Sequence, residues 1–107
     1  MGMDVRLLDE QGHPQRGLPD PAGGTFDAAG DFDRLLELRN DLRVWSRVDP
    51  YAETRVTGSD ATALLGELDE LDNAAHDGPE RRGVARLRVM AERCRDDDRL
   101  TLLFVGD

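Results

Sequence analysis

Hydrophobic residues alternate with polar ones near both ends of the chain, and this pattern predicts two β-strands. In the segment 3–8, Val5 and Leu7 alternate with charged residues, which is typical of a strand with one buried face. In the segment 99–105, apolar residues occupy both alternating sets, as in a strand inside a sheet. We therefore expect the segment 99–105 to lie within a small sheet, beside the segment 3–8.

Between these strands, apolar residues recur at helical spacing. The clearest stripe predicts a helix over about 59–75 and consists of Ala61, Leu64, Leu65, Leu68, Leu71 and Ala75. We expect Ser59 to cap this helix and Gly78 to end it. Pro79 then starts the next helix, which runs to about Arg95. The predicted buried face of that helix consists of Val84, Leu87, Met90, Ala91 and Cys94.

An earlier helix is expected to begin at Asp31, whose carboxylate can cap free N–H groups. Apolar residues follow it at helical spacing, namely Phe32, Leu35, Leu36 and Leu38. The end of this helix is ambiguous, because residues 42–48 fit both a helical stripe and the alternation of a strand. We favour a helix that continues to about Ser46.

The tripeptide Asp49-Pro50-Tyr51 predicts a turn, because proline presets φ and the Asp49 carboxylate can accept the N–H groups that follow. A short extended segment at 54–57 could supply a third strand. Together these elements predict an α+β fold. A small antiparallel sheet, including the N- and C-terminal strands, packs against two to three helices. At 107 residues, the chain is expected to form a single domain, 1–107.

The segment 10–30 is expected to be a loop, because five glycines and three prolines fall within its 21 residues. A return strand near 16–18 and an apolar anchor at Phe26 are its expected features. A long loop inside a small domain is unusual, so we expect it to be either mobile or functional.

The composition limits the choice of partner. The net charge is −9, which argues against binding nucleic acid or an anionic membrane and fits a basic protein partner. All fourteen basic residues are arginine, and isoleucine is absent, as expected of a GC-rich genome. One cysteine excludes an internal disulfide. No apolar run is long enough to span a membrane, and no signal pattern opens the chain, so we expect a cytoplasmic protein.

The charge is uneven along the chain. Residues 1–50 carry a net charge of −4, residues 51–78 carry −6, and residues 79–107 carry +1. Two interpretations remain open. In the first, the helix after Pro79 pairs its arginines with the acids of the preceding helix; the groups concerned are Arg81, Arg88 and Arg95, with Glu67, Asp69 and Asp72. In the second, the acidic residues stay free and meet a basic partner; they are Glu67, Asp69, Glu70 and Asp72, together with Glu53.

We predict no catalytic, cofactor-binding or metal-binding residues, and hence no enzyme. His13 and His76 have no neighbouring ligand at metal spacing, and the run 96–98 lacks the alternation of a calcium loop. Cys94 falls on the apolar face of its helix, where a thiol acts as a small hydrophobe. Asp and Glu are so frequent that no acid/base pair stands out.

Several short motifs resemble a set of small bacterial proteins that have no assigned activity. These motifs are Asp49-Pro50-Tyr51 with Thr54, the Leu-Leu-x-Glu-Leu segment at 64–68, and the terminal Phe104-Val105-Gly106-Asp107. The resemblance covers about residues 35–107 and transfers no functional residue. Small acidic proteins of this kind include immunity proteins that neutralise toxins.

We therefore predict a small acidic protein-binding module of the immunity or antitoxin type, which covers a basic surface such as the cleft of a nucleic-acid-processing toxin. The expected partner-binding residues, with Tyr51 as aromatic anchor, are Asp49, Tyr51, Glu53, Glu67 and Glu70. One alternative is a self-associating structural or regulatory subunit, such as a homodimer, that exposes Trp45 and Val89. A second alternative is a small enzyme that uses the loop 10–30.

Overall fold

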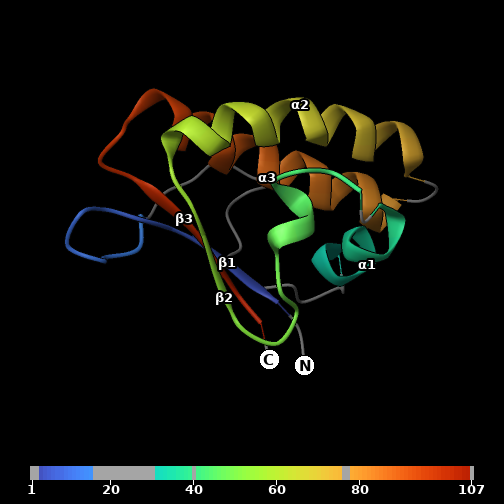
Figure 1. Ribbon diagram of the computed structural model, residues 1–107, viewed down its shortest axis with the longest axis horizontal. Helices are drawn as coiled ribbons and strands as arrows, with labels where there is room; N and C mark the ends of the chain where they lie inside the picture. Colours follow the sequence, from blue (N-terminus) through green and yellow to red (C-terminus); the bar gives the residue numbers. More distant parts are fainter. Residues whose placement is uncertain (1–2, 16–30, 40, 76–77, 107) are drawn as a thin grey trace.

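The computed structural model describes residues 3–15, 31–39, 41–75 and 78–106. In chain order, they form β1 (Asp4–Leu8), α1 (Asp31–Leu38), the 3-10 helix η1 (Trp45–Arg47), β2 (Glu53–Val56), α2 (Gly58–Ala74), α3 (Gly78–Asp96) and β3 (Thr101–Val105) (Figure 1). None of the described helices is long and apolar enough to cross a lipid bilayer.

The three strands form an antiparallel sheet in the order β1-β3-β2. β3 is central, and its Phe104 lies opposite Val5 of β1 on one side and Thr54 of β2 on the other. The prediction of an α+β fold with adjacent terminal strands is therefore confirmed. The third strand begins one residue earlier than the predicted extended segment.

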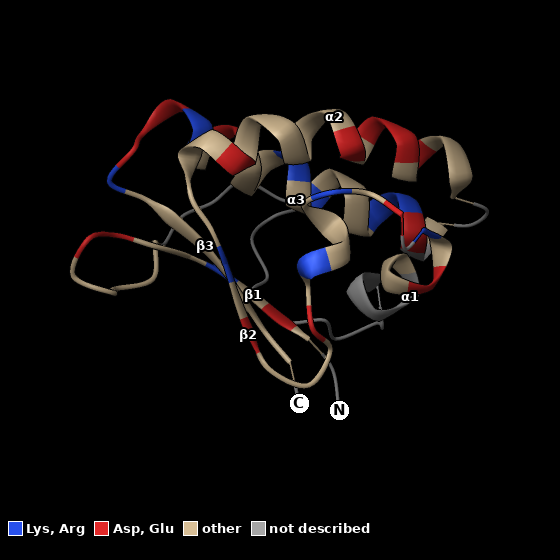
Figure 2. Cartoon of the chain, viewed as in Figure 1, with Lys and Arg blue, Asp and Glu red and all other residues tan. Residues whose placement is uncertain are grey.

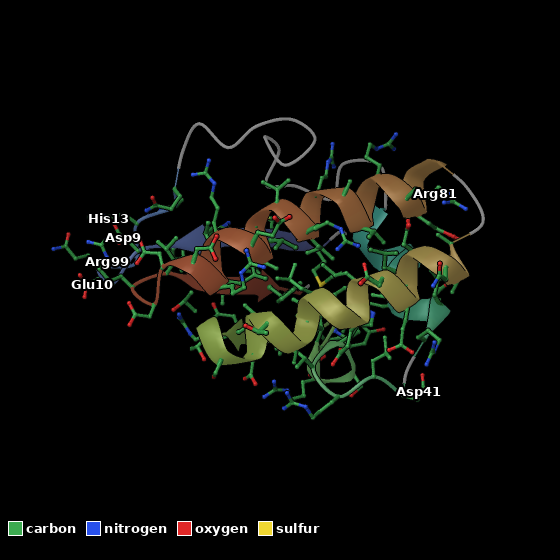
Figure 3. All side chains as sticks on the ribbon, turned by 90° about the horizontal axis from the view of Figure 1, so that it is seen from above. Asp9, Glu10, His13, Asp41, Arg81 and Arg99 are labelled. Atoms are coloured by element: carbon green, nitrogen blue, oxygen red, sulfur yellow. The ribbon has the colours of Figure 1, made fainter. Side chains whose placement is uncertain are left out.

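One face of the sheet is covered by the helices. α2 and α3 lie side by side across it (Figures 1 and 3). The strand residues that enter the shared core are Val5, Leu7, Val56, Leu102 and Phe104. The predicted stripes of both helices are buried, except that Leu65 is only partly covered. The hydrophobic periodicity of α2 and α3 therefore identified the core correctly.

The predicted continuation of the first helix to Ser46 is wrong. α1 ends at Leu38, and η1 is a separate element. In an α-helix, each N–H donates to the carbonyl four residues earlier. Here the N–H groups of Val44 and Trp45 donate instead to the side chain of Glu67. A carboxylate that is distant in sequence thus separates η1 from α1.

Two predicted helix boundaries are also wrong. α2 begins at Gly58 with Thr57 at its N-cap, so Ser59 lies inside the helix and does not cap it. Gly78 is the first residue of α3 and does not end α2, which stops at Ala74. Glycine and proline marked this connection correctly, but sequence alone did not show which helix includes the glycine.

The loop predicted over 10–30 begins, directly after β1, with a turn. The Asp9 carboxylate accepts the N–H groups of Gln11 and His13, each at 2.9 Å. Gly12 has a φ of 82°, in the left-handed region that glycine enters without steric penalty. The rest of the predicted loop, residues 16–30, lies outside the described residues, as do the return strand at 16–18 and Phe26.

Candidate functional site

Tyr51 is the one large hydrophobic side chain that is exposed in the described part of the chain, with 81% of its surface accessible. It belongs to the turn between η1 and β2, at the lower end of the molecule in Figure 1. An exposed aromatic side chain of this size is a natural starting point for a binding surface.

Hydrogen bonds fix the backbone of this turn. The Asp49 carboxylate accepts the N–H of Tyr51 at 2.8 Å, as predicted, and the Ala52 N–H donates to the Asp49 carbonyl at 3.3 Å. The Thr54 hydroxyl oxygen accepts the Asp49 N–H at 3.1 Å and donates to the Arg47 carbonyl at 3.3 Å. The backbone at Tyr51 is therefore fixed before any partner binds.

The residue that follows β3 packs closely against the same turn. The Gly106 N–H donates to the Ala52 carbonyl at 2.8 Å. A Cβ atom at position 106 would collide with the backbone of Pro50 and would lie 2.7 Å from the Asp49 carbonyl oxygen. Only glycine permits this approach, so the residue that follows the central strand β3 packs directly against the backbone of the turn.

The structure divides the predicted site into two groups. Asp49, Tyr51 and Glu53 lie close together in sequence on the turn and the start of β2, and all three are exposed. Glu53 forms no ion pair with any residue that the structure describes. Glu67 and Glu70 lie on α2, across the molecule from the turn (Figure 1). The two groups therefore do not form one continuous site.

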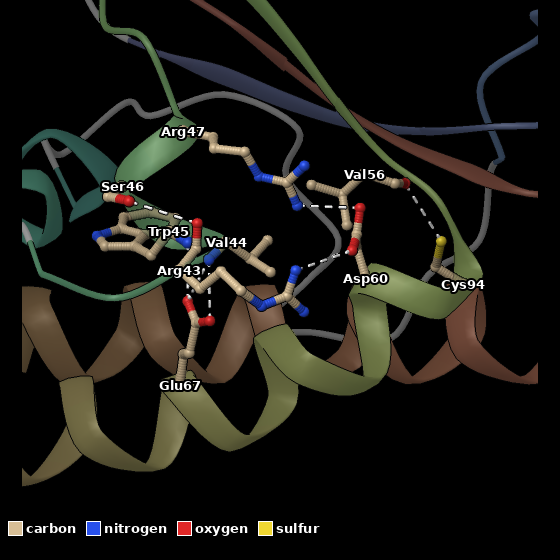
Figure 4. A network of polar contacts seen from close by, with 9 residues as sticks. All are labelled: Arg43, Val44, Trp45, Ser46, Arg47, Val56, Asp60, Glu67 and Cys94. Carbon is tan, nitrogen blue, oxygen red and sulfur yellow. Dashed lines mark hydrogen bonds and ion pairs between the residues drawn. The ribbon is translucent and has the colours of Figure 1, made fainter.

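Glu67 was expected on the surface, and this expectation is wrong. Its side chain is 8% exposed, and its carboxylate accepts the Val44 N–H at 2.9 and 3.1 Å and the Trp45 N–H at 2.7 Å (Figure 4). It thus supplies the acceptor that the first N–H groups of η1 need, and its charge suits a helix N-terminus. Its spacing from Leu64 and Leu71 placed it on the edge of the apolar stripe, a signal that the sequence did contain.

Trp45 was considered as exposed apolar surface, but it is buried, at 1% exposure. Its indole N–H donates to the Leu35 carbonyl of α1 at 3.2 Å. Its ring meets Phe104 edge to face, with the centroids 5.8 Å apart. Val89 is partly buried against the core. Neither residue provides the exposed apolar surface that this alternative required.

Other acids on the same flank of α2 contact the segment 39–47. Asp60 forms ion pairs with Arg47 at 2.9 Å and with Arg43 at 3.6 Å (Figure 4). The hydrogen bond from Arg47 is the main cause that lowers the pKa of Asp60. Glu70 is half-exposed and lies 3.6 Å from Arg39. Together with Glu67, these acids attach the segment 39–47 to α2.

On the opposite flank of α2, acids pair with α3. Asp69 contacts Arg88 at 2.8 Å, and Asp72 contacts Arg81 at 3.9 Å. Arg95, however, binds its neighbour Asp96, so its predicted pairing with α2 is wrong. In Figure 2, the charged residues of α2 are accordingly all acidic, and basic residues lie on the neighbouring α3. The helix-to-helix interpretation is confirmed for two of the three arginines, and much of the acidic charge of α2 is compensated.

A polar hollow of about 340 Å³ lies between the turn after β1 and the α3–β3 connection. Asp9, Glu10 and Arg99 lie at this end of the molecule (Figure 3). Hydrogen bonds lower the pKa of both lining aspartates, Asp9 chiefly through the His13 N–H and Asp97 chiefly through Arg99. A general acid at neutral pH needs a raised pKa, so these two aspartates do not suit that role.

The remaining candidate groups, the possible metal ligands and the Cys94 thiol, offer no reactive site among the described residues. Within the described ranges, no three potential metal-ligating side chains cluster. Cys94 is buried, and burial raises the pKa of its thiol, which opposes activation as a nucleophile.

No family model, curated protein or solved structure matches the chain. The candidate site thus rests on the geometry of the turn around Tyr51. The sequence analysis did not include Thr54 or Gly106 among the residues of this site.

Proposed function

We propose that this chain is a small non-enzymatic binding module that recognises a basic surface on a protein partner through the turn 49–53. The observation that carries this proposal is the 81% exposure of Tyr51 on a turn whose backbone is already fixed. Tyrosine buries a large area on binding and loses little side-chain entropy, because it has few rotatable bonds. A turn that is ordered in advance lowers the entropy loss further.

The charges near the anchor favour a basic partner. Asp49 and Glu53 flank Tyr51 in sequence, and both are exposed. The tyrosine ring itself attracts an arginine or lysine through its π face. The net charge of −9 would speed the approach of a positively charged protein. Immunity and antitoxin proteins that cover the basic cleft of a nucleic-acid-processing toxin fit this description, and we place the interaction in the cytoplasm.

The proposal differs from the original prediction in where the partner binds. Glu67 is engaged with the backbone of η1, and it has no free carboxylate to offer. Glu70 stays a predicted contact, but it lies on α2 and apart from the turn. The centre of the proposed surface therefore moves from α2 to Tyr51 and Glu53.

A displayed library of random peptides tests the proposal without a known partner. Selection on the wild-type chain should enrich peptides rich in arginine and lysine. Tyr51→Ala and Glu53→Arg should each weaken their binding by about tenfold or more, a loss typical of an interface hot spot. Glu92→Arg makes the same charge change on an exposed site of α3 and should leave binding nearly unchanged.

Tyr51→Ala should also leave the thermal midpoint nearly unchanged, because the side chain is mostly in solvent. Two outcomes contradict the proposal. Either the enriched peptides lack basic residues, or they bind the Tyr51→Ala variant as tightly as they bind the wild type.

A further inference from the structure

We propose that the outer edge of β2 pairs with β2 of a second copy of this chain, in an antiparallel register centred on Thr54. This pairing would join two three-stranded sheets into one continuous sheet. The inference does not rest on the proposed function, because it requires no basic partner, although Glu53 takes part in both. It rests on the direction of backbone groups in β2 and on the two charged residues that flank Thr54.

The backbone of β2 leaves one edge unpaired. The Ala52 carbonyl accepts the Gly106 N–H. The direction of the backbone N–H and C=O groups alternates along a strand, so these groups of Thr54 and Val56 also point toward β3. Glu53 and Arg55 consequently direct their N–H and C=O groups away from β3. No described residue forms a backbone hydrogen bond with these groups beyond the sheet. β2 is an outer strand of the sheet and lies nearest the viewer in Figure 1.

The other outer strand is better protected. The Gln15 N–H donates to the outward Leu7 carbonyl of β1 at 2.7 Å, and Pro14 forms a bridge with Leu8. This contact blocks part of the edge of β1. Natural proteins commonly protect sheet edges in this way. Among the described residues, the edge of β1 is thus partly covered by the chain that follows it, whereas no described backbone covers the edge of β2.

The charges on β2 select one register for a pair of identical strands. Because outward-facing residues must oppose each other, Glu53 can meet Glu53, Arg55 can meet Arg55, or each can meet the other. The first two registers place like charges opposite each other, which is destabilising. The third register is centred on Thr54. In it, Glu53 of each copy lies opposite Arg55 of the other copy. Both side chains are exposed and have no ion-pair partner among the described residues.

The outer face of the sheet extends this complementarity. In one row, Asp4 and Glu53 flank Val105, so this row is acidic. In the neighbouring row, Arg6 and Arg55 flank Leu103, so that row is basic. A two-fold axis at Thr54 continues the acidic row of one copy into the basic row of the other. A second copy of this chain thus carries the charge pattern that this edge requires.

The interface would be small, because β2 contains four residues. Small interfaces give weak association, so the dimer should form at protein concentrations of about 10 µM to 1 mM. Sedimentation velocity across this range should show the wild-type mass rising toward twice the monomer value. Hydrogen exchange should show the amides of Glu53 and Arg55 becoming protected at the upper concentrations.

Charge exchange between two positions provides the decisive test. Glu53→Arg and Arg55→Glu each create like-charged pairs and should weaken dimerisation by about tenfold. The double variant Glu53→Arg/Arg55→Glu restores opposite charges and should recover wild-type association. Glu92→Arg on α3 is the control, and it should leave association nearly unchanged. Each substituted side chain is exposed, so folding should be preserved.

Three results would overturn the proposal: a wild-type chain that is monomeric at every concentration, a dimer that persists unchanged in either single variant, or a double variant as monomeric as the single ones. Failure of the proposed function looks different, because it concerns peptide binding by Tyr51. A dimer with the predicted charge dependence could be found whether or not basic peptides bind.

Discussion

Removal of the Glu67 carboxylate should destabilise the protein far more than removal of its neighbour Glu70. In Glu67→Ala, the N–H groups of Val44 and Trp45 lose their acceptor inside the protein. Each buried, unpaired N–H group destabilises the fold by about 1–3 kcal/mol. Two such groups give about 2–6 kcal/mol, and access of water to a residue near the surface favours the lower half of this range.

The control is Glu70→Ala on the same helix. Glu70 lies 3.6 Å from Arg39 and is half-exposed, so its removal should change the free energy of unfolding by less than about 1 kcal/mol. Glu67→Gln should give an intermediate loss, because an amide oxygen can still accept a hydrogen bond but the negative charge and one acceptor atom disappear.

The assay is urea denaturation followed by tryptophan fluorescence. The sequence contains a single tryptophan, and Trp45 is both buried and a direct donor to Glu67. Its emission therefore reports on the perturbed contact and on global unfolding. If Glu67→Ala and Glu70→Ala unfold within about 0.5 kcal/mol of each other, an amount typical of surface substitutions, the role assigned to Glu67 is wrong.

Three other substitutions test the core, the turn and the acid response. Leu68→Ala removes a fully buried side chain of α2 and should lower the free energy of unfolding by about 2–5 kcal/mol; a negligible loss in chemical denaturation would contradict the assigned stripe. Gly106→Ala forces a Cβ against the Pro50 backbone and should lower the thermal midpoint; an unchanged midpoint would show that the turn relaxes freely. Asp60 has a pKa lowered from 3.8, chiefly by Arg47, so its contribution to stability is present above that pH and is lost as the pH falls through the folded-state pKa. Asp60→Asn should therefore be less stable than the wild type at neutral pH, and the difference should shrink below about pH 4; a difference that is constant with pH would exclude this ion pair as its source.

Much of the fold was predictable because its signals are local. The apolar stripes of α2 and α3 and the alternation in β1 follow from the period of each element, and the Asp49 turn follows from the chemistry of its own side chain. The core position of Cys94 was found in the same way. Periodicity within a segment therefore sufficed wherever the structure depends on neighbours along the chain.

The errors have a different physical origin. The N–H groups of residues 44 and 45, where a continued helix was predicted, bond to Glu67, which lies 23 residues beyond Val44 in the sequence. The tight approach of Gly106 to Pro50 is equally non-local. For the same reason, a charge count could not reveal that the acids of α2 are divided between the segment 39–47 and α3. Tyr51, the predicted anchor, is exposed on its turn, and its role in binding stays a prediction.

The strand order has a consequence for synthesis on the ribosome. β3 joins β1 to β2, but it is translated after both of them. β1 and β2 therefore remain without their shared neighbour until β3 has left the ribosome. A chain truncated before residue 101 would leave β1 and β2 without their shared neighbour, and unpaired strand edges of this kind promote aggregation.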